Sequence, residues 1–153
     1  MILRETTISD AKLLFEWSND SVTRRNSFSD KPIVWEGHLS WLTKKLNDES
    51  SHLFIAEDEG ISVGTIRIDA DNTNKELCIS YSVSPECRGR GYGAKLIKLA
   101  EDRLRSKYSG YELIGEVKSD NVASQKCFKK CGFTGGDTID RGSFKEIVFS
   151  KKL

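Results

Sequence analysis

The residues best suited to chemistry form a glycine-rich loop, Arg88-Gly89-Arg90-Gly91-Tyr92-Gly93, between a strand pattern and a helical pattern. Glycine has no side chain, so backbone N–H groups can converge there, and a helix N-terminus adds about half a positive charge. Such a loop suits a phosphate or pyrophosphate, and Arg88 and Arg90 add cations beside it. The alternative is a tight strand-to-helix turn that binds nothing, but three alternating glycines cost chain entropy that such a turn does not require.

The glycine pattern fits two well-known nucleotide-binding motifs poorly. A P-loop is excluded because no Gly-Lys-Ser/Thr follows the glycines. Residues 89–94 satisfy Gly-x-Gly-x-x-Ala, with an acid about 20 residues later at Glu112 or Glu116, as in Rossmann domains. A Rossmann domain, however, begins with this unit and repeats it in a parallel sheet. Here hairpin strands precede the loop and only 37 residues follow Glu116, so the match is interpreted as accidental.

Hydrophobic periodicity indicates which elements position the loop. Alternating or continuous apolar runs predict strands over 2–7, 53–56, 61–68, 76–83, 113–117, from 133 onward, and 144–149. Helical spacing predicts helices from the Ser9-Asp10 cap through Trp17, over 35–46, directly after the glycine loop, and over 121–130, with one more turn at 22–26. The order β-αα-βββ-α-β-α-ββ predicts a mixed sheet with helices, in one domain over 1–153.

Composition and charge narrow the class of protein. The chain has 153 residues, is 37% hydrophobic and 31% charged, and carries a net charge of +1, which predicts an ordinary soluble domain without nucleic-acid partners. No apolar run reaches the ~18–20 residues of a membrane span, and the first residues lack a signal peptide. We therefore expect a cytoplasmic protein that does not engage a membrane. The cysteines form no C-x-x-C and only two histidines could join them, so no metal site is expected; the residues concerned are Cys78, Cys87, Cys127, Cys131, His38 and His52.

Read as Arg88-x-x-Gly91-x-Gly93, the loop resembles the acetyl-CoA signature of the GCN5-related N-acetyltransferase (GNAT) family. The family's Asn-x-x-Ser/Ala…Tyr/Phe-x-x-x-Gly-Phe helix is matched by Asn121, Ser124, Phe128, Gly132 and Phe133. The resemblance follows the order of elements over essentially all 153 residues. It implies the GNAT fold, a single mixed α/β (α+β) domain with a central, mostly antiparallel sheet of about seven strands flanked by about four helices.

The resemblance also implies acetyl-CoA as the acetyl donor, with no metal. The glycine loop would donate backbone hydrogen bonds to the pyrophosphate, and the strand before it would pair with pantetheine as a pseudo-strand. The helix that begins at Asn121 would hold the arm and line the thiol end. The implied cofactor-binding residues are Tyr81, Ser82, Val83, Arg88, Gly89, Arg90, Gly91, Tyr92, Gly93, Ala94, Asn121, Ser124 and Phe128.

Acetyl transfer to an amine needs a base for the ammonium proton and an acid for the departing thiolate. Glu116 matches the base of some relatives, Glu76 is a second candidate, and a chain of waters is the third possibility. Phe128 stands where many relatives have tyrosine, and phenylalanine has no proton to give. Cys127, Tyr81 and Tyr92 are possible substitutes, and protonation by solvent is the other alternative.

The acceptor is expected to lie against the first two helices, near Trp17, Asn19, Arg24 and Asn26. This region resembles a branch that acetylates nucleotide-linked amino sugars, where Arg24 or Arg25 would suit a phosphate. The same residues also fit ordinary core packing, helix caps and solvated charges. We expect acetyl transfer to a primary amine of a small molecule, such as an amino sugar or a nucleotide-linked amino sugar. Two alternatives stay open: a protein N-terminus such as that of a ribosomal protein, and a non-catalytic acetyl-CoA sensor. The strand-rich C-terminus leaves a homodimer open.

Overall fold

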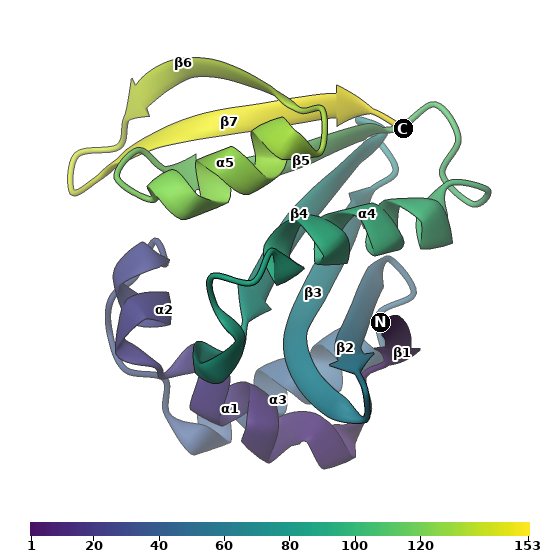
Figure 1. Ribbon diagram of the computed structural model, residues 1–153, viewed down its shortest axis with the longest axis vertical. Helices are drawn as coiled ribbons and strands as arrows, with labels where there is room; N and C mark the ends of the chain where they lie inside the picture. The colour runs from purple at the N-terminus through teal and green to yellow at the C-terminus, as the bar shows by residue number, and fades with distance from the viewer.

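Seven strands form one sheet, and the computed structural model describes all residues from 1 to 153. The strands are β1 (Ile2–Glu5), β2 (Ser51–Asp58), β3 (Ile61–Asp71), β4 (Glu76–Val83), β5 (Glu112–Lys118), β6 (Thr134–Asp140) and β7 (Lys145–Lys152). Their order across the sheet is β1-β2-β3-β4-β5-β7-β6 (Figure 1). Only β4 and β5 run parallel, and every other neighbouring pair is antiparallel. The predicted mixed, mostly antiparallel sheet is therefore confirmed, and a Rossmann sheet is excluded.

Five helices accompany the sheet: α1 (Ala11–Ser18), α2 (Ser21–Asn26), α3 (Trp35–Leu46), α4 (Tyr92–Leu104) and α5 (Val122–Lys130). The helices α4 and α5 cover one face, while α1 and α3 pack together against the other face at β2 (Figure 1). The count exceeds the expected four because the turn predicted after α1 is a separate helix. Asp20 caps it, since its Oδ2 accepts a hydrogen bond of 3.2 Å from the Thr23 backbone N–H.

Alternation along the strands builds two apolar cores. On β3, Ile66 and Ile68 are fully buried beneath α4, where Leu96 and Ile97 are fully buried as well. The smaller core lies between α1, α3 and β2 and consists of Ala11, Leu14, Trp17, Leu42, Leu53 and Ile55. The first core holds the start of α4, and hence the glycine loop, against the centre of the sheet.

The parallel strands β4 and β5 separate halfway along their length. Their register runs from Glu76 opposite Glu112 to Ile79 opposite Gly115, and no pair follows. Beyond this point the two strands diverge toward α2 (Figure 1). The Phe128 ring of α5 lies at the branch point, against Gly115 on one strand and with its centroid 5.9 Å from the Tyr81 ring on the other. The free edges of both strands therefore face an open space.

Two further predictions concerned membrane-spanning helices and metal sites. None of the helices has the length and apolar character needed to cross a bilayer. No three His, Cys, Asp or Glu side chains are arranged to hold a metal ion. The cytoplasmic location stays a prediction.

Candidate active site

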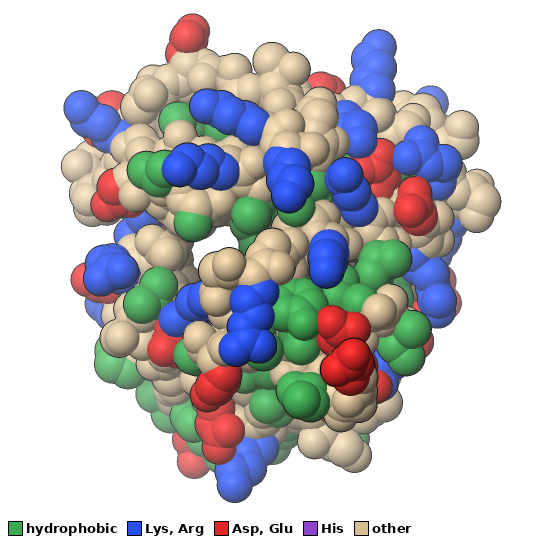
Figure 2. All heavy atoms as spheres, in the orientation of Figure 1, with side chains coloured by type: hydrophobic (Ala, Val, Ile, Leu, Met, Phe, Trp, Pro, Cys, Tyr) green, Lys and Arg blue, Asp and Glu red, His purple; other side chains and the backbone are tan.

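A cleft of about 1060 Å³ opens where β4 and β5 diverge. Figure 2 shows it as an opening between α5 and the loop before α4, with Lys and Arg side chains along the lower edge. The glycine loop and α5 form one side, while α2, α3 and the facing side chains of β3, β4 and β5 form the other. The volume suits a ligand of cofactor size.

The glycine loop forms a cradle for an anion at one end of this cleft. Gly89 and Gly91 adopt left-handed conformations, with φ of +77° and +78°. Gly91 is the N-cap of α4, and no side chain caps the helix. The first N–H groups of α4 have no intrahelical partner, so they remain available to a phosphate. The expected pyrophosphate cradle fits this geometry.

The free edge of β4 lies next to this cradle. Ser80 to Val83 pair with β3 on one side, but on the other side they have no strand partner. Their backbone groups can therefore bind an extended arm as an added strand would. Asn121 caps α5, its Oδ1 accepting from the Ser124 backbone N–H at 3.2 Å. The cleft thus has room and unpaired polar groups for pantetheine beside the predicted residues.

Tyr81 presents the one phenol that lies between α4 and α5. Its Oη donates a hydrogen bond of 3.1 Å to Ser124 Oγ. Burial, reinforced by the neighbouring Cys127, raises the pKa of Tyr81 far above its usual range. The phenol therefore keeps its proton at neutral pH. Phe128, by contrast, is 2% exposed and packs within the core behind it.

Some side chains of the predicted cofactor set have other partners. Arg88 Nη2 donates to Asp20 Oδ2 at 2.5 Å and to Thr23 Oγ1 at 3.1 Å, which ties the glycine loop to the start of α2. The Tyr92 hydroxyl donates to Asp58 Oδ2 at 2.7 Å. The Arg90 side chain is exposed outside the cleft and Ala94 is buried in the core. Backbone contacts from these residues to a cofactor stay a prediction.

The two candidate bases lie in different places. Glu116 lines the cleft on β5, on the face of the sheet opposite α5. Its charge contributes, after desolvation, to raising the pKa of the Cys78 thiol on β4. Glu76 opens β4 at the paired end, opposite Glu112, and does not line the cleft. Of the two predicted bases, only Glu116 therefore lies in the cleft, and the role of either stays a prediction.

The four residues predicted to bind the acceptor divide into two pairs. Trp17 is 7% exposed within the smaller core, and Asn19 exchanges hydrogen bonds of 2.9 and 2.8 Å with the Ile33 backbone; neither lines the cleft. Trp17 packs within the smaller core and Asn19 holds the loop at Ile33, so a role for either in binding the acceptor stays a prediction. Arg24 and Asn26 do line the cleft.

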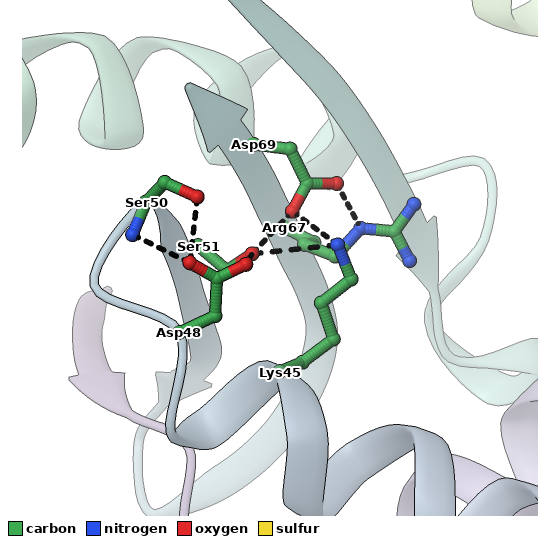
Figure 3. Close-up of polar contacts among 6 residues, drawn as sticks. All are labelled: Lys45, Asp48, Ser50, Ser51, Arg67 and Asp69. Atoms are coloured by element: carbon green, nitrogen blue, oxygen red, sulfur yellow. Dashed lines mark hydrogen bonds and ion pairs between the residues drawn. The ribbon is translucent and has the colours of Figure 1, made fainter. Parts of the chain in front are cut away.

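Sequence reasoning missed a group of polar side chains on β3, β4 and α3. Asp69 accepts hydrogen bonds from Lys45 Nζ (2.8 Å), Ser51 Oγ (2.6 Å) and Arg67 Nε (2.8 Å), as Figure 3 shows. Burial opposes ionisation of Asp69, but these hydrogen bonds and the two cations outweigh it, so its pKa lies below the usual range. The missed cleft residues are Trp41, Arg67, Asp69, Cys78 and Ser80. The available signal was the alternation of polar Thr65, Arg67 and Asp69 with apolar Ile66 and Ile68 on a central strand.

Contacts between α2 and the far side of the sheet lie beside the cleft. Phe28, after α2, stacks on Phe144 of the β6–β7 turn with ring centroids 5.0 Å apart. Lys118 Nζ lies 5.5 Å from the Phe144 ring centroid and donates a 2.9 Å hydrogen bond to the Arg25 carbonyl. These contacts join α2 to β5 and to the β6–β7 turn, and they bound the cleft on that side.

Comparison with known proteins agrees with this geometry. The sequence model described as "Acetyltransferase (GNAT) family" matches residues 13–133. A spermidine N(1)-acetyltransferase of Escherichia coli K12 is 22% identical over 133 residues, covering 86% of this chain and 72% of the relative. A ribosomal-protein-alanine N-acetyltransferase structure from Brucella melitensis superposes with a TM-score of 0.85 at 20% identity, covering 100% of both chains. The aminoglycoside acetyltransferase AAC(6')-Ib with coenzyme A gives 0.83 at 18% identity, covering 98% and 93%.

Proposed function

Since the chain belongs to the GNAT family and is an acetyl-CoA-dependent N-acetyltransferase, we propose that it acetylates the primary amine of a small molecule. The observation that supports this proposal is the pair of contacts, Phe28 with Phe144 and Lys118 with Arg25, that bound the cleft on its acceptor side. A peptide acceptor needs a groove along which the chain can continue past the reacting amine. A small molecule has no such requirement and fits a cleft that is bounded on this side.

The donor fits the other half of the cleft. The N–H groups at the start of α4 would hold the pyrophosphate, and the free edge of Ser80 to Val83 would hold the pantetheine arm. Acetyl-CoA, when bound, supplies an acetyl group activated as a thioester. Glu116 follows directly after Gly115, the last β5 residue that pairs with β4, so it lies in the cleft where the two strands begin to diverge.

Glu116 is the base in this proposal. Its carboxylate takes the proton of the acceptor ammonium, directly or through one water, so that the nitrogen lone pair becomes nucleophilic. No side chain neutralises it, since Glu116 has no hydrogen-bond or ion-pair partner within the chain.

Tyr81 is the acid. Its hydroxyl lies within the cleft, 3.1 Å from Ser124 Oγ on α5, the helix that would line the thiol end of the cofactor. In this proposal the phenol gives its proton to the departing thiolate, the task that Phe128 cannot perform, and the Ser124 hydroxyl stabilises the phenolate that remains. The Tyr92 hydroxyl donates instead to Asp58, which does not line the cleft.

The narrower prediction of a nucleotide-linked amino sugar has no support from the comparisons, whose named acceptors include spermidine, phosphinothricin, a ribosomal-protein alanine and aminoglycosides. Arg24 was predicted to bind the nucleotide phosphate, but its guanidinium group is hydrogen bonded within the protein. Its Nε donates to the Ser18 carbonyl at 2.6 Å, and Nη1 to the carbonyls of Ser29 and Lys31 at 3.1 and 3.2 Å. The proposed acceptor class is therefore the small-molecule amine in general.

A thiol-release assay with acetyl-CoA tests the proposal against four acceptor classes: free amino acids and amino sugars, nucleotide-linked amino sugars, polyamines, and peptides with free N-termini. Turnover of small amines, with peptides slower, is expected. Glu116→Gln should lower kcat about 100-fold while the Kd for CoA is kept, and Glu76→Gln serves as the matched control. Turnover of peptides alone would refute the small-molecule acceptor. Tight CoA binding without turnover of any amine would favour the sensor.

A further inference from the structure

Three arginines line the cleft, and two of them have their guanidinium groups engaged. Arg24 donates to three backbone carbonyls and to Ser27 Oγ, and Arg88 donates to Asp20 and Thr23. Arg67 differs, because its Nε alone is hydrogen bonded and neither Nη1 nor Nη2 has a partner in the protein. Figure 3 shows the two terminal nitrogens pointing away from the network that holds Nε.

The Arg67 guanidinium is fixed in place although its terminal nitrogens are free. Nε donates to Asp69 Oδ2 at 2.8 Å, and Cζ lies 5.3 Å from the centroid of the Trp41 ring. The side chain is 32% exposed, within the cleft. Such a held guanidinium presents two parallel N–H donors, the arrangement that matches a carboxylate or a phosphate.

The neighbouring charges leave the terminal nitrogens of Arg67 free. Asp69 shares its negative charge between Arg67 and Lys45, whose Nζ lies 2.8 Å from Oδ1. Asp48 joins the same network through Ser51 and interacts electrostatically with Lys45, so these four charges sum to zero. The attraction for an anion therefore comes from the free N–H groups of Arg67 and not from a net charge of the group.

The sheet register sets the distance from Arg67 to the proposed base. Arg67 pairs with Ser80 across β3 and β4, and Cys78 pairs with Ile114 across β4 and β5. Glu116 therefore lies level with Ser80, two strands from Arg67. Neighbouring strands are about 4.8 Å apart, so the two backbones are about 10 Å apart, or slightly more where the strands diverge. An acceptor whose amine and anion are separated by a few bonds can reach both.

We propose that the acceptor is an amine that also carries a carboxylate or phosphate, and that Arg67 binds this anion while Glu116 faces the amine. This inference rests on the proposed N-acetyltransferase function and names its substrate class. Arg67 is thus a specificity-determining residue, held in position by Asp69 and Trp41.

The test uses the intact protein saturated with CoA and matched probes that differ only in the anion: 4-aminobutyrate against 4-aminobutyramide, and 3-aminopropyl phosphate against 3-amino-1-propanol. Affinity is measured by two-dimensional NMR titration, whose spectrum also reports folding. A charge-assisted bidentate contact predicts that at least one anionic probe binds about 10- to 100-fold more tightly than its neutral partner. Whichever pair shows this preference distinguishes a carboxylate from a phosphate.

Variants assign the preference to Arg67. Arg67→Gln should abolish it, Arg67→Lys should retain part of it because the charge remains without the fork, and Arg103→Gln, a surface arginine on α4, is the matched control. Equal binding within both pairs, binding of no probe, or a preference that survives Arg67→Gln would overturn the inference. Thiol release with all four probes and with the acceptor panel of the proposed function separates the two proposals: turnover without an anion preference refutes only the role of Arg67, and absence of turnover with every amine refutes the proposed function.

Discussion

Replacing Gly115 with alanine tests the packing that separates β4 from β5. Gly115 is the last β5 residue that pairs with β4, and a Cβ there would lie 2.3, 2.5 and 2.9 Å from three atoms of the Phe128 ring. Its φ is not positive, so alanine suits the backbone itself. The ring cannot retreat freely, because it packs against Phe133 and Phe149 with centroids 5.0 and 5.7 Å away.

The expected cost follows from these distances. Overpacking a core costs about 1–3 kcal/mol, and three contacts below 3 Å place Gly115→Ala at the upper end. Alanine recovers about 0.4–1 kcal/mol by restricting the unfolded chain, so the net loss is about 2 kcal/mol. In a Phe128→Ala background the overlap disappears, and the same Gly115→Ala change should stabilise by about 0.5 kcal/mol. The sign of the effect therefore reverses.

Urea unfolding of the four proteins in this double-mutant cycle measures the coupling, which we expect to be about 2–3 kcal/mol. In a thermal scan, Gly115→Ala alone should lower Tm by about 4–8 °C. Gly37→Ala is the matched control: Gly37 lies in α3 with no atom within 4 Å of the added Cβ, so this change should stabilise the fold. Equal stability of Gly115→Ala and the wild type, or an unchanged effect in Phe128→Ala, would refute the proposed packing.

Three further predictions concern proton transfer, the acceptor side of the cleft and acid stability. Tyr81→Phe should lower kcat about 100-fold without weakening CoA binding, as steady-state kinetics and calorimetry will measure; an unchanged kcat would assign the proton to solvent. Arg24→Gln frees the carbonyls of residues 29 and 31 and should raise KM for the acceptor about 10-fold at constant Kd for CoA, a result that altered CoA affinity would contradict. The hydrogen bond from Arg4 lowers the pKa of Asp10, so its stabilisation is present above the unfolded pKa of about 3.9 and is lost as pH falls through the folded value. Urea unfolding between pH 7 and pH 2.5 should therefore show a shallower acid limb for Asp10→Asn, and parallel limbs would disprove this linkage.

Much of the fold could be predicted because the local pattern of apolar and polar residues determines which segments form strands and which form helices. The strand expected over 76–83 is β4, and the expected helix after the glycine loop is α4. The strand expected over 61–68 continues to Asp71, because residues 69–71 pair with the start of β4. Such extensions depend on a partner strand and leave little trace in the strand's own residues.

The geometry of the glycine loop could be predicted, whereas the side-chain contacts on the acceptor side could not. The loop conformation is a local property of six residues; its contacts with a cofactor and the role of Glu116 stay predictions. Arg88, in contrast, pairs with Asp20, which is 68 residues away, and Lys118 meets Arg25 across 93 residues. Such pairs cannot be recognised from residue spacing. The sequence therefore could not show that the guanidinium groups of Arg24 and Arg88 are hydrogen bonded within the protein, or that the terminal nitrogens of Arg67 are free.

The sequence by itself determined the element order, the anion cradle at the start of α4 and the resemblance to an acetyl-CoA-dependent family. These follow from periodicity, from glycine conformations and from helix termini, which act over a few residues. Only the tertiary structure decided that β4 and β5 part at Gly115, that Glu76 lies outside the cleft and that Arg67 lies inside it with free donors. Those outcomes depend on strand register and on contacts between distant segments, because the same side chain can face a core, a partner or a cleft according to what packs against it.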